Sequence, residues 1–317
     1  MKQFQWKDGY QGEYWFAWGV SAEGYRLVDD KEYRVYDSSS KGTPYTASPW
    51  LVAKSNTEVP YNPLDKPDLH RKFAALRNDK ELLAFADKYG LLGREVPLVP
   101  VSGGGLIYGE SLARWHTELG TMGSVLQIWD WAVWNLASHD ENPNAGKLGQ
   151  IFSWQGNDKI LLRMITKLFW EKGQPRVLPL AKSSGPKPGY RDEVLSVHEP
   201  RLTKLVKRGE VTKLARYYVC REVNRRLRGH VSPQLLPFSE DIKDVSLFPD
   251  SLLTALWGLF MREITGNVKM LRCPICERHF EVTGSRSIYC SSACRQKAWE
   301  QNNPDKVRAK RERKGKQ

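Results

Sequence analysis

Four of the chain's five cysteines stand close together near its C-terminus, at Cys273, Cys276, Cys290 and Cys294. Their spacing is C-x2-C-x13-C-x3-C, which is two close pairs joined by a stretch long enough to turn back on itself. Four thiolates brought together by such a turn form a closed tetrahedral zinc site, which has no open position for a catalytic water. The spacing therefore predicts a structural zinc ion as the cofactor.

Disulfides are the main alternative to zinc, and the rest of the sequence disfavours them. The N-terminal residues MKQFQWKDGY contain no apolar segment of a signal peptide. The longest apolar run, LLTALWGLFM, is about half the length needed to cross a bilayer. We therefore expect a cytoplasmic protein with no membrane partner, in which thiols stay reduced. His279 in place of one cysteine is another alternative, and the isolated Cys220 is expected to be a small buried hydrophobic residue.

The elements around the cysteines are those of a zinc ribbon or treble clef. Cys273 to Cys276 is predicted to form a tight knuckle, residues 283–285 a hairpin turn, and Ser291 the N-cap of a helix that turns Cys294 toward the metal. The apolar residues available for a small finger core are few: Phe280, Val282, Ile288, Tyr289 and Trp299. So small a core cannot fold alone, so metal binding would supply folding free energy.

The charge distribution points to a polyanionic partner. The net charge is +13, and from Lys269 onward 13 Lys and Arg residues face only 5 Asp and Glu residues. A dense run of cations binds phosphates through counterion release. We therefore expect a nucleic acid, DNA ahead of RNA, while a merely solubilising tail remains the alternative. The predicted contacts are Arg295, Lys297, Lys306, Arg308, Lys310, Arg311, Arg313 and Lys314.

The segments RCPICERHFEV and YCSSACRQKAW, followed by a basic tail, resemble the C-terminal zinc fingers of the CGNR type found in bacterial proteins. An apolar helix such as SLLTALWGLFMREI commonly precedes those fingers. The upstream stretches NPLDKPDLHRKFAAL, LLAFADKYGLLG and HVSPQLL also look like bacterial proteins of uncharacterised activity that carry the same finger. The resemblance implies the four cysteines as ligands and a role as a DNA-binding transcriptional regulator. Cys294 is followed here by Arg-Gln-Lys instead of Gly-Asn-Arg, which departs from the family motif at the expected DNA contacts.

The rest of the chain predicts an α+β fold. We expect two or three antiparallel strands in residues 1–58, a loop over 94–109, a hairpin turning at residues 156–158, a loop or linker over 171–192, and short strands over 232–249. Helices are predicted over about 79–89, capped by Asn78 or Asp79 and ended by Gly90, over 110–138, over 210–228, and over 252–264, capped by Ser251 and ended by Gly266.

The predicted helix 110–138 carries a heptad stripe of Trp115, Leu119, Met122, Leu126, Trp129, Val133 and Leu136. We expect it to pack against other helices of this chain, with a homodimer seam as the alternative. The predicted domains are a mixed α+β domain over 1–268, with a subdivision near 171–192, a four-cysteine zinc finger over 269–301 and a basic tail over 302–317.

The sequence contains no recognised catalytic motif. The segment VSGGGLIYGES lacks the Gly-Lys-Ser/Thr of a P-loop, and neither G-x-S-x-G nor H-E-x-x-H occurs. Three function classes remain open. They are a DNA-binding regulator whose N-terminal sensor or interaction domain takes a small-molecule effector, a protein-interaction scaffold with a purely structural finger, and a nucleic-acid enzyme that depends on a residue such as His139 or Asp140.

Overall fold

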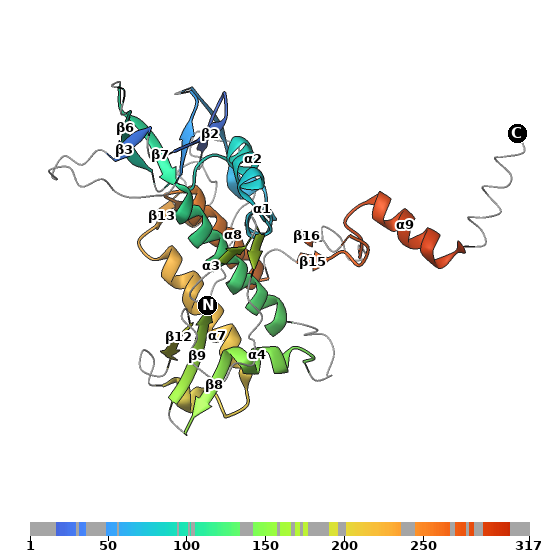
Figure 1. Cartoon of the computed structure of the whole chain (residues 1–317). Helices are drawn as coiled ribbons and strands as arrows, with labels where there is room; N and C mark the ends of the chain where they lie inside the picture. The colour runs from blue at the N-terminus through green and yellow to red at the C-terminus, as the bar shows by residue number, and fades with distance from the viewer. Residues whose placement is uncertain are drawn as a thin grey trace, which may run out of the picture.

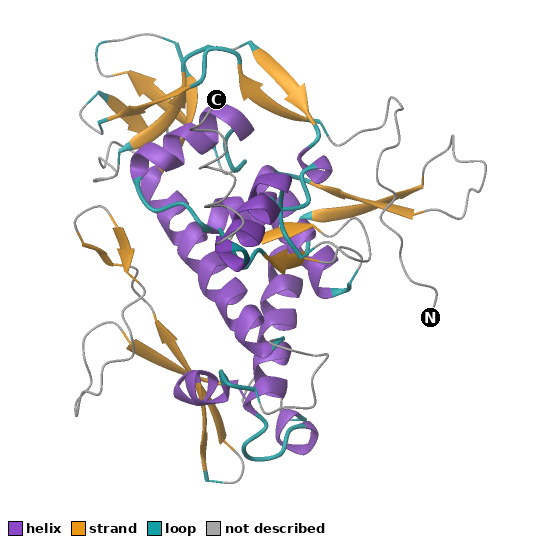
Figure 2. Cartoon of the chain, turned by 90° about the vertical axis from the view of Figure 1, so that its right-hand side faces the viewer, coloured by secondary structure: helices purple, strands orange, loops and turns teal. Residues whose placement is uncertain are grey.

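The computed structural model describes residues 17–29, 32–35, 49–55, 57–93, 95–100, 102, 105–133, 142–156, 159–165, 169–171, 174–176, 190–195, 201–235, 245–266, 270–276, 279–281 and 288–304. Strands gather at the two ends of the main body, and long helices run between them (Figures 1 and 2). The predicted α+β class is confirmed.

An antiparallel sheet of five strands forms the N-terminal end of the main body, in the order β2-β4-β7-β6-β3. Its strands are β2 (Tyr25–Val28), β3 (Tyr33–Val35), β4 (Trp50–Ala53), β6 (Val96–Pro100) and β7 (Ile107–Ser111). A separate antiparallel pair joins β1 (Trp18–Ser21) to β5 (Glu58–Tyr61). The N-terminal region therefore contains more strands than the sequence predicted.

The predicted loop over 94–109 is wrong, because β6 and β7 occupy most of it and pair with each other. The two prolines and the glycines of this segment suggested a loop. Leu98 is nevertheless fully buried in a small cluster with Trp50 and Val52 of β4. Packing of alternate side chains against a neighbouring strand here outweighs the local preference of the residues.

The helices agree more closely with the predictions. They are η1 (Pro63–Asp65), α1 (Leu69–Ala74), α2 (Asp79–Tyr89), α3 (Leu112–Ala132), α4 (Ala145–Ile151), α6 (Leu202–Leu205), α7 (Val211–Leu227) and α8 (Leu252–Ile264). The long helix α3 is shorter than predicted at both ends. Glu110 and Ser111 belong to β7, the helix ends at Ala132, and Leu136 lies outside the described residues.

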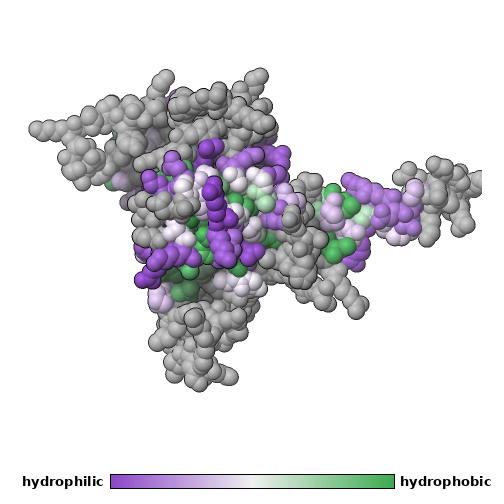
Figure 3. Space-filling model, turned by 90° about the horizontal axis from the view of Figure 1, so that it is seen from below, coloured by the Kyte–Doolittle hydropathy of each residue, from purple (hydrophilic) through white to green (hydrophobic). Residues whose placement is uncertain are grey.

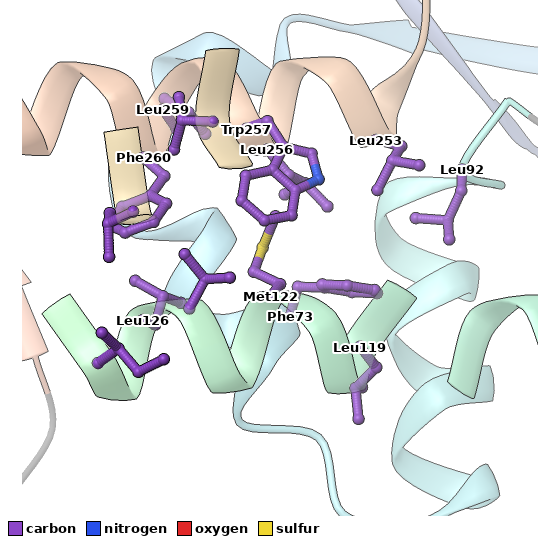
Figure 4. Packing of buried hydrophobic residues seen from close by; sticks show 14 of the residues in the cluster. Phe73, Leu92, Leu119, Met122, Leu126, Leu253, Leu256, Trp257, Leu259 and Phe260 are labelled. Carbon is purple, nitrogen blue, oxygen red and sulfur yellow. The ribbon is translucent and has the colours of Figure 1, made fainter. Parts of the chain in front are cut away.

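The main hydrophobic core lies between α3 and α8 and confirms that the heptad stripe packs within this chain. Trp115, Leu119, Met122 and Leu126 are buried, and Trp129 is partly buried against the same cluster. Figure 4 shows the Met122 side chain facing the Trp257 ring of α8, with Phe73 of α1 beside them. Met122 and Phe73 are fully buried and Trp257 is 1% exposed. Burial of side chains this large is the main source of stability in such a core.

The predicted helix ends are confirmed at α2 and α8. The side chain of Asn78 accepts a hydrogen bond from the Glu81 amide, and that of Ser251 accepts one from the Thr254 amide. Gly90 follows α2 with a φ of 86°, in the left-handed region that favours glycine. These caps satisfy amide and carbonyl groups that a helix leaves unpaired at its ends.

The far end of the main body is formed by short antiparallel strands. The three-stranded sheet β12-β9-β8 contains the predicted hairpin, with β8 (Phe152–Gln155) paired to β9 (Lys159–Ile165). Two further antiparallel pairs are β10 (Phe169–Glu171) with β11 (Gln174–Arg176), and β13 (Val231–Leu235) with β14 (Val245–Pro249). The pair β13–β14 does not belong to the far end, because β14 packs against α8 and β13 lies near β7 (Figure 1). Since β11 and β12 (Tyr190–Val194) lie within or overlap 171–192, that segment is not the uninterrupted loop that was predicted.

Candidate metal centre and nucleic-acid interface

The C-terminal module, here called the finger (residues 270–304), stands beside the main body (Figure 1). It is built from β15 (Met270–Arg272), β16 (His279–Glu281) and α9 (Ser292–Asn302). The strands pair antiparallel with Arg272 opposite His279, so that Cys273 leaves the hairpin at the point where the knuckle begins. Cys290 directly precedes the N-cap of α9 and Cys294 lies in its first turn, and the chain brings both back to this knuckle.

The four cysteine sulfurs form one compact cluster. The Sγ atoms of Cys273, Cys276, Cys290 and Cys294 all lie within 4.8 Å of one another. Cys290 Sγ is 3.3 Å from Cys276 Sγ and 3.5 Å from Cys294 Sγ. These separations exceed the roughly 2.05 Å of a disulfide bond. They are close to the about 3.8 Å between sulfurs of a tetrahedral site with Zn–S bonds of about 2.3 Å. The donor set and its size therefore fit a closed four-thiolate metal site.

The pKa values of the clustered thiols also favour a bound cation. Burial opposes a thiolate at Cys273, but hydrogen bonds with the backbone of Cys290, Cys276 and Ile275 outweigh it and lower the pKa of Cys273 to about 6. Hydrogen bonding with the Cys276 side chain is the main cause that raises the pKa of Cys290 to about 12. Thiols this close cannot all ionise unless a positive charge lies among them. A divalent metal ion bound by the four cysteines would supply that charge.

The start of α9 is fixed as the sequence predicted. Ser291 is its N-cap, and the Ser291 Oγ accepts a hydrogen bond of 3.2 Å from the Cys294 amide. The helix stops at Asn302, and the Asn303 amide nitrogen Nδ2 donates to the Trp299 carbonyl over 2.9 Å. The capped first turn therefore holds Cys294 toward the other three cysteines and aims the rest of α9 away from them.

The outer surface of α9 is hydrophilic and basic next to the metal cluster. Arg295 and Lys297 are both exposed, and Ala298 is the buried residue of this helix. Figure 3 shows hydrophilic residues over the projecting end of the finger. The predicted tail contacts Lys306, Arg308, Lys310, Arg311, Arg313 and Lys314 lie outside the described residues, as does Val282 of the expected finger core.

The finger buries few of its apolar side chains. Phe280 and Tyr289 are half-buried, whereas Ile288 is 56% exposed and Trp299 is 41% exposed. This agrees with the expectation that these residues bury too little surface by themselves. A module this small has too few neighbouring side chains to cover them. Its order must depend more heavily on the cysteine cluster, and two apolar side chains are left at the surface.

A second group of ionisable residues, which the sequence did not predict, lies inside the main body. His70 Nε2 lies 2.8 Å from the Glu263 carboxylate, which also accepts hydrogen bonds from Arg71. Arg71 reaches Asp130 of α3 as well, at 2.8 Å and 3.1 Å. The group links α1, α3 and α8. Because the His70 and Glu263 side chains are 0% and 7% exposed, the group ties helices together and cannot meet a large ligand.

Three further residues can be compared with their predictions, namely Cys220, His116 and Glu118. Cys220 is exposed on α7, so its expected burial is wrong. The helix turns it away from Val219 and Val223, which are buried. His116 and Glu118 point to different partners, Asp79 and Arg226, as their spacing predicted. His139 and Asp140 lie outside the described residues.

Comparison with protein-family models, curated proteins and solved structures finds no match to this chain. The likeness to CGNR-type fingers therefore stays a resemblance, carried by the cysteine spacing and the sequence around it. Within the described residues, no helix combines the length and the apolar character needed to cross a membrane.

Proposed function

We propose that this chain is a zinc-dependent nucleic-acid-binding protein that contacts phosphates through the finger. The observation that carries the proposal is the position of Arg295 and Lys297, which are exposed on the helix whose first turn holds the fourth cysteine. Zinc would be held by the four cysteine thiolates and would supply only structural order. Because α9 begins at the cluster, order at the cluster fixes where these two cations point.

The basic tail extends this surface. Residues 305–317 contain seven Lys and Arg residues against Asp305 and Glu312. Cations added along the chain increase affinity without sequence preference, since each one that meets a phosphate releases a counterion. We propose that the tail follows the phosphate backbone beyond the contact made by α9. In this arrangement the domains remain those expected from the sequence, namely 1–268, 269–301 and 302–317.

The finer proposal is a DNA-binding transcriptional regulator in the cytoplasm of a bacterium, with DNA preferred over RNA. It rests on the resemblance to CGNR-type fingers. In such a protein, the main body would sense a small-molecule effector or mediate interaction, including homodimer formation. Duplex DNA and duplex RNA of matched sequence, compared in the same titration, distinguish the two polymers.

A second candidate function is a protein-interaction module. It is favoured by the exposed side chains of Ile288 and Trp299, because apolar groups left at the surface of a small module are common in protein interfaces. This candidate requires no nucleic acid. It predicts that Trp299→Ala weakens partner binding while neutralisation of the tail has no effect.

The experiment compares full-length variants in binding to labelled duplex DNA. Arg295→Gln and Lys297→Gln are combined with glutamine at the six predicted tail contacts. A control set carries glutamine at exposed cations of the main body, Lys54, Lys66, Arg77 and Lys80. We expect the finger set to lose affinity at least tenfold and to reduce the salt slope by about 0.9 for each lost phosphate contact. If both sets bind as the wild type does, the finger is not the interface.

A further inference from the structure

The segment that contains α6 and α7 is as strongly basic as the C-terminal region. Residues 201–230 contain ten Lys and Arg residues and only two acidic residues, Glu210 and Glu222. This balance equals the +8 of the region from Lys269 onward, in a shorter stretch. All thirty residues are described, so the charge belongs to a defined surface of the main body.

Part of this positive charge is paired with acidic side chains of the same chain. Arg226 pairs with Glu118 at 2.7 Å, and Arg225 pairs with Glu222 at 2.6 Å. Arg221 also contacts Glu222, at 3.2 Å. These pairs join or brace α7 where it packs on the core. The acidic residue Glu222 is 5% exposed, so it contributes little negative charge to the outer surface.

Of the remaining seven cations, Arg216 is half-buried and Lys213 pairs with Glu210 at 3.7 Å. The other five are exposed and are here called the basic α6–α7 surface: Arg201, Lys204, Lys207, Arg208 and Arg228. Among the described residues, none of the recorded ion pairs engages them. Leu214, Tyr218 and Val219 face the core, whereas Cys220, Asn224 and Arg228 are exposed. The outward face of α7 therefore carries cationic and neutral polar groups. The exposed acidic side chain beside it, Glu210 at the N-cap, pairs with Lys213.

The positions of the cations suit a duplex. Lys207 and Arg208 precede α7 and Arg228 follows it, so positive charge stands at both ends of the helix. Seventeen residues at about 1.5 Å each make α7 about 25 Å long. The major groove of B-DNA is about 12 Å wide, which is narrower than this separation. Cations at the two ends of the helix can thus meet phosphates on both sides of one groove.

We propose that the basic α6–α7 surface is a second phosphate-binding surface, which takes the backbone of duplex DNA independently of the finger. The proposal extends the proposed function, because it gives the same polymer two contacts on one chain. A duplex is favoured over a protein partner because five exposed cations surround a single large exposed apolar side chain, Leu205, which is 60% exposed. Two weak contacts on one polymer bind together more tightly than either does alone.

The test neutralises Lys204, Lys207, Arg208 and Arg228 together by substitution with glutamine in the full-length protein. These side chains are exposed, so the fold should be unaffected, and circular dichroism checks this. The matched control is the set Lys54→Gln, Lys66→Gln, Arg77→Gln and Lys80→Gln, which removes the same amount of charge elsewhere. The probe is a labelled DNA duplex, titrated at several salt concentrations, with a matched RNA duplex and single-stranded DNA beside it.

We expect the α6–α7 set to reduce the slope of log Kobs against log salt by about 3 to 4, at about 0.9 for each of four phosphates. The control set should leave that slope within error of the wild type. Equal slopes for the two sets would overturn the inference, and so would a loss confined to RNA or to single strands. The finger set separates the two proposals. If only the finger set loses binding, the proposed function stands and this surface is not an interface. If only the α6–α7 set loses binding, the reverse holds.

Discussion

The Sγ atoms of Cys276 and Cys290 lie 3.3 Å apart, although thirteen residues separate them in the sequence. This contact joins the knuckle after β15 to the residue that directly precedes the N-cap of α9. It is too long for a disulfide and short enough for two ligands of one metal ion. Cys273 and Cys294 complete the set within 4.8 Å. The geometry thus fits four ligands of one metal ion.

The first prediction concerns metal content. The purified full-length protein should hold one zinc ion per chain, measured by elemental mass spectrometry. Cys276→Ser should lose it, because three thiolates cannot close the tetrahedron. Cys220→Ser is the matched control, since this exposed thiol lies outside the cluster, and its zinc content should equal that of the wild type. Wild-type protein that is folded and carries no metal would contradict the account.

The second prediction compares the same substitution at a buried and at an exposed tryptophan. Trp257→Ala should lower the free energy of unfolding by about 3–5 kcal/mol, because it leaves a cavity beside Met122 and Phe260. Trp257 is 1% exposed, and its ring centroid lies 6.2 Å from that of Phe260. Trp299→Ala, at a 41% exposed site, should change the free energy of unfolding by less than about 0.5 kcal/mol. Urea denaturation followed by circular dichroism measures both, and equal losses would be inconsistent with α8 as the core helix.

The third prediction concerns pH. Burial lowers the pKa of His70 below its ordinary value, so the folded protein keeps this imidazole neutral while the unfolded chain binds a proton below about 6.5. Stability must therefore fall as pH falls from 7 toward 5. Glu263 acts in the same direction at lower pH. Although burial opposes its charge, hydrogen bonds from Arg71 and His70 lower its pKa to about 2, so its contribution is present above about 4.5 and is lost as pH falls toward 2.

Urea midpoints of the wild type and of His70→Gln, measured between pH 7 and pH 5, test this account of His70. The variant has no imidazole to titrate, and its amide still offers a donor to Glu263. Its unfolding free energy should vary less with pH than that of the wild type. Parallel pH profiles for the two proteins would show that His70 does not titrate on unfolding.

The fourth prediction uses two glycines in different backbone conformations. Gly90 has a φ of 86°, and a Cβ placed there would lie 2.7 Å from the Gly19 carbonyl oxygen. Gly90→Ala should therefore destabilise the protein by about 1–3 kcal/mol. Gly149 lies in α4 with no atom within 4 Å of its ideal Cβ, so Gly149→Ala should stabilise by about 0.5–1 kcal/mol. Thermal unfolding of both variants measures the two effects. Melting temperatures that shift in the same direction would contradict this description of the loop after α2.

The sequence predicted the structure best where a local signal and tertiary packing agree. The stripe on α3 and the caps at Asn78, Ser251 and Ser291 are of this kind, because period and capping are local properties that burial then reinforces. The cysteine cluster was also predictable. Two pairs of closely spaced cysteines are the sequence pattern of a zinc site, and the ligands of one metal ion must lie together in space. The strand β6 was not, because its prolines point to a loop, whereas its order depends on burial of Leu98 against β4.

The contacts between distant segments could not be read from the sequence. Glu263 lies 192 residues after Arg71, and no sequence pattern in α1 or α8 indicates that the two side chains pair. The exposure of Cys220 and Trp299 likewise depends on which faces of α7 and α9 the rest of the chain covers. The charge of residues 201–230 was present in the sequence. Only the fold separates the arginines that pair internally from the cations that face outward.

Binding of the wild-type, zinc-loaded protein to a labelled DNA duplex, measured from about 50 to 200 mM salt, tests the central claim most directly. The account predicts that log Kobs falls linearly with log salt, with a slope steeper than about −4, since the finger, the tail and the α6–α7 surface would together neutralise at least five phosphates. No binding at the lowest salt, or an affinity that salt leaves unchanged, would contradict the claim that this protein binds nucleic acid.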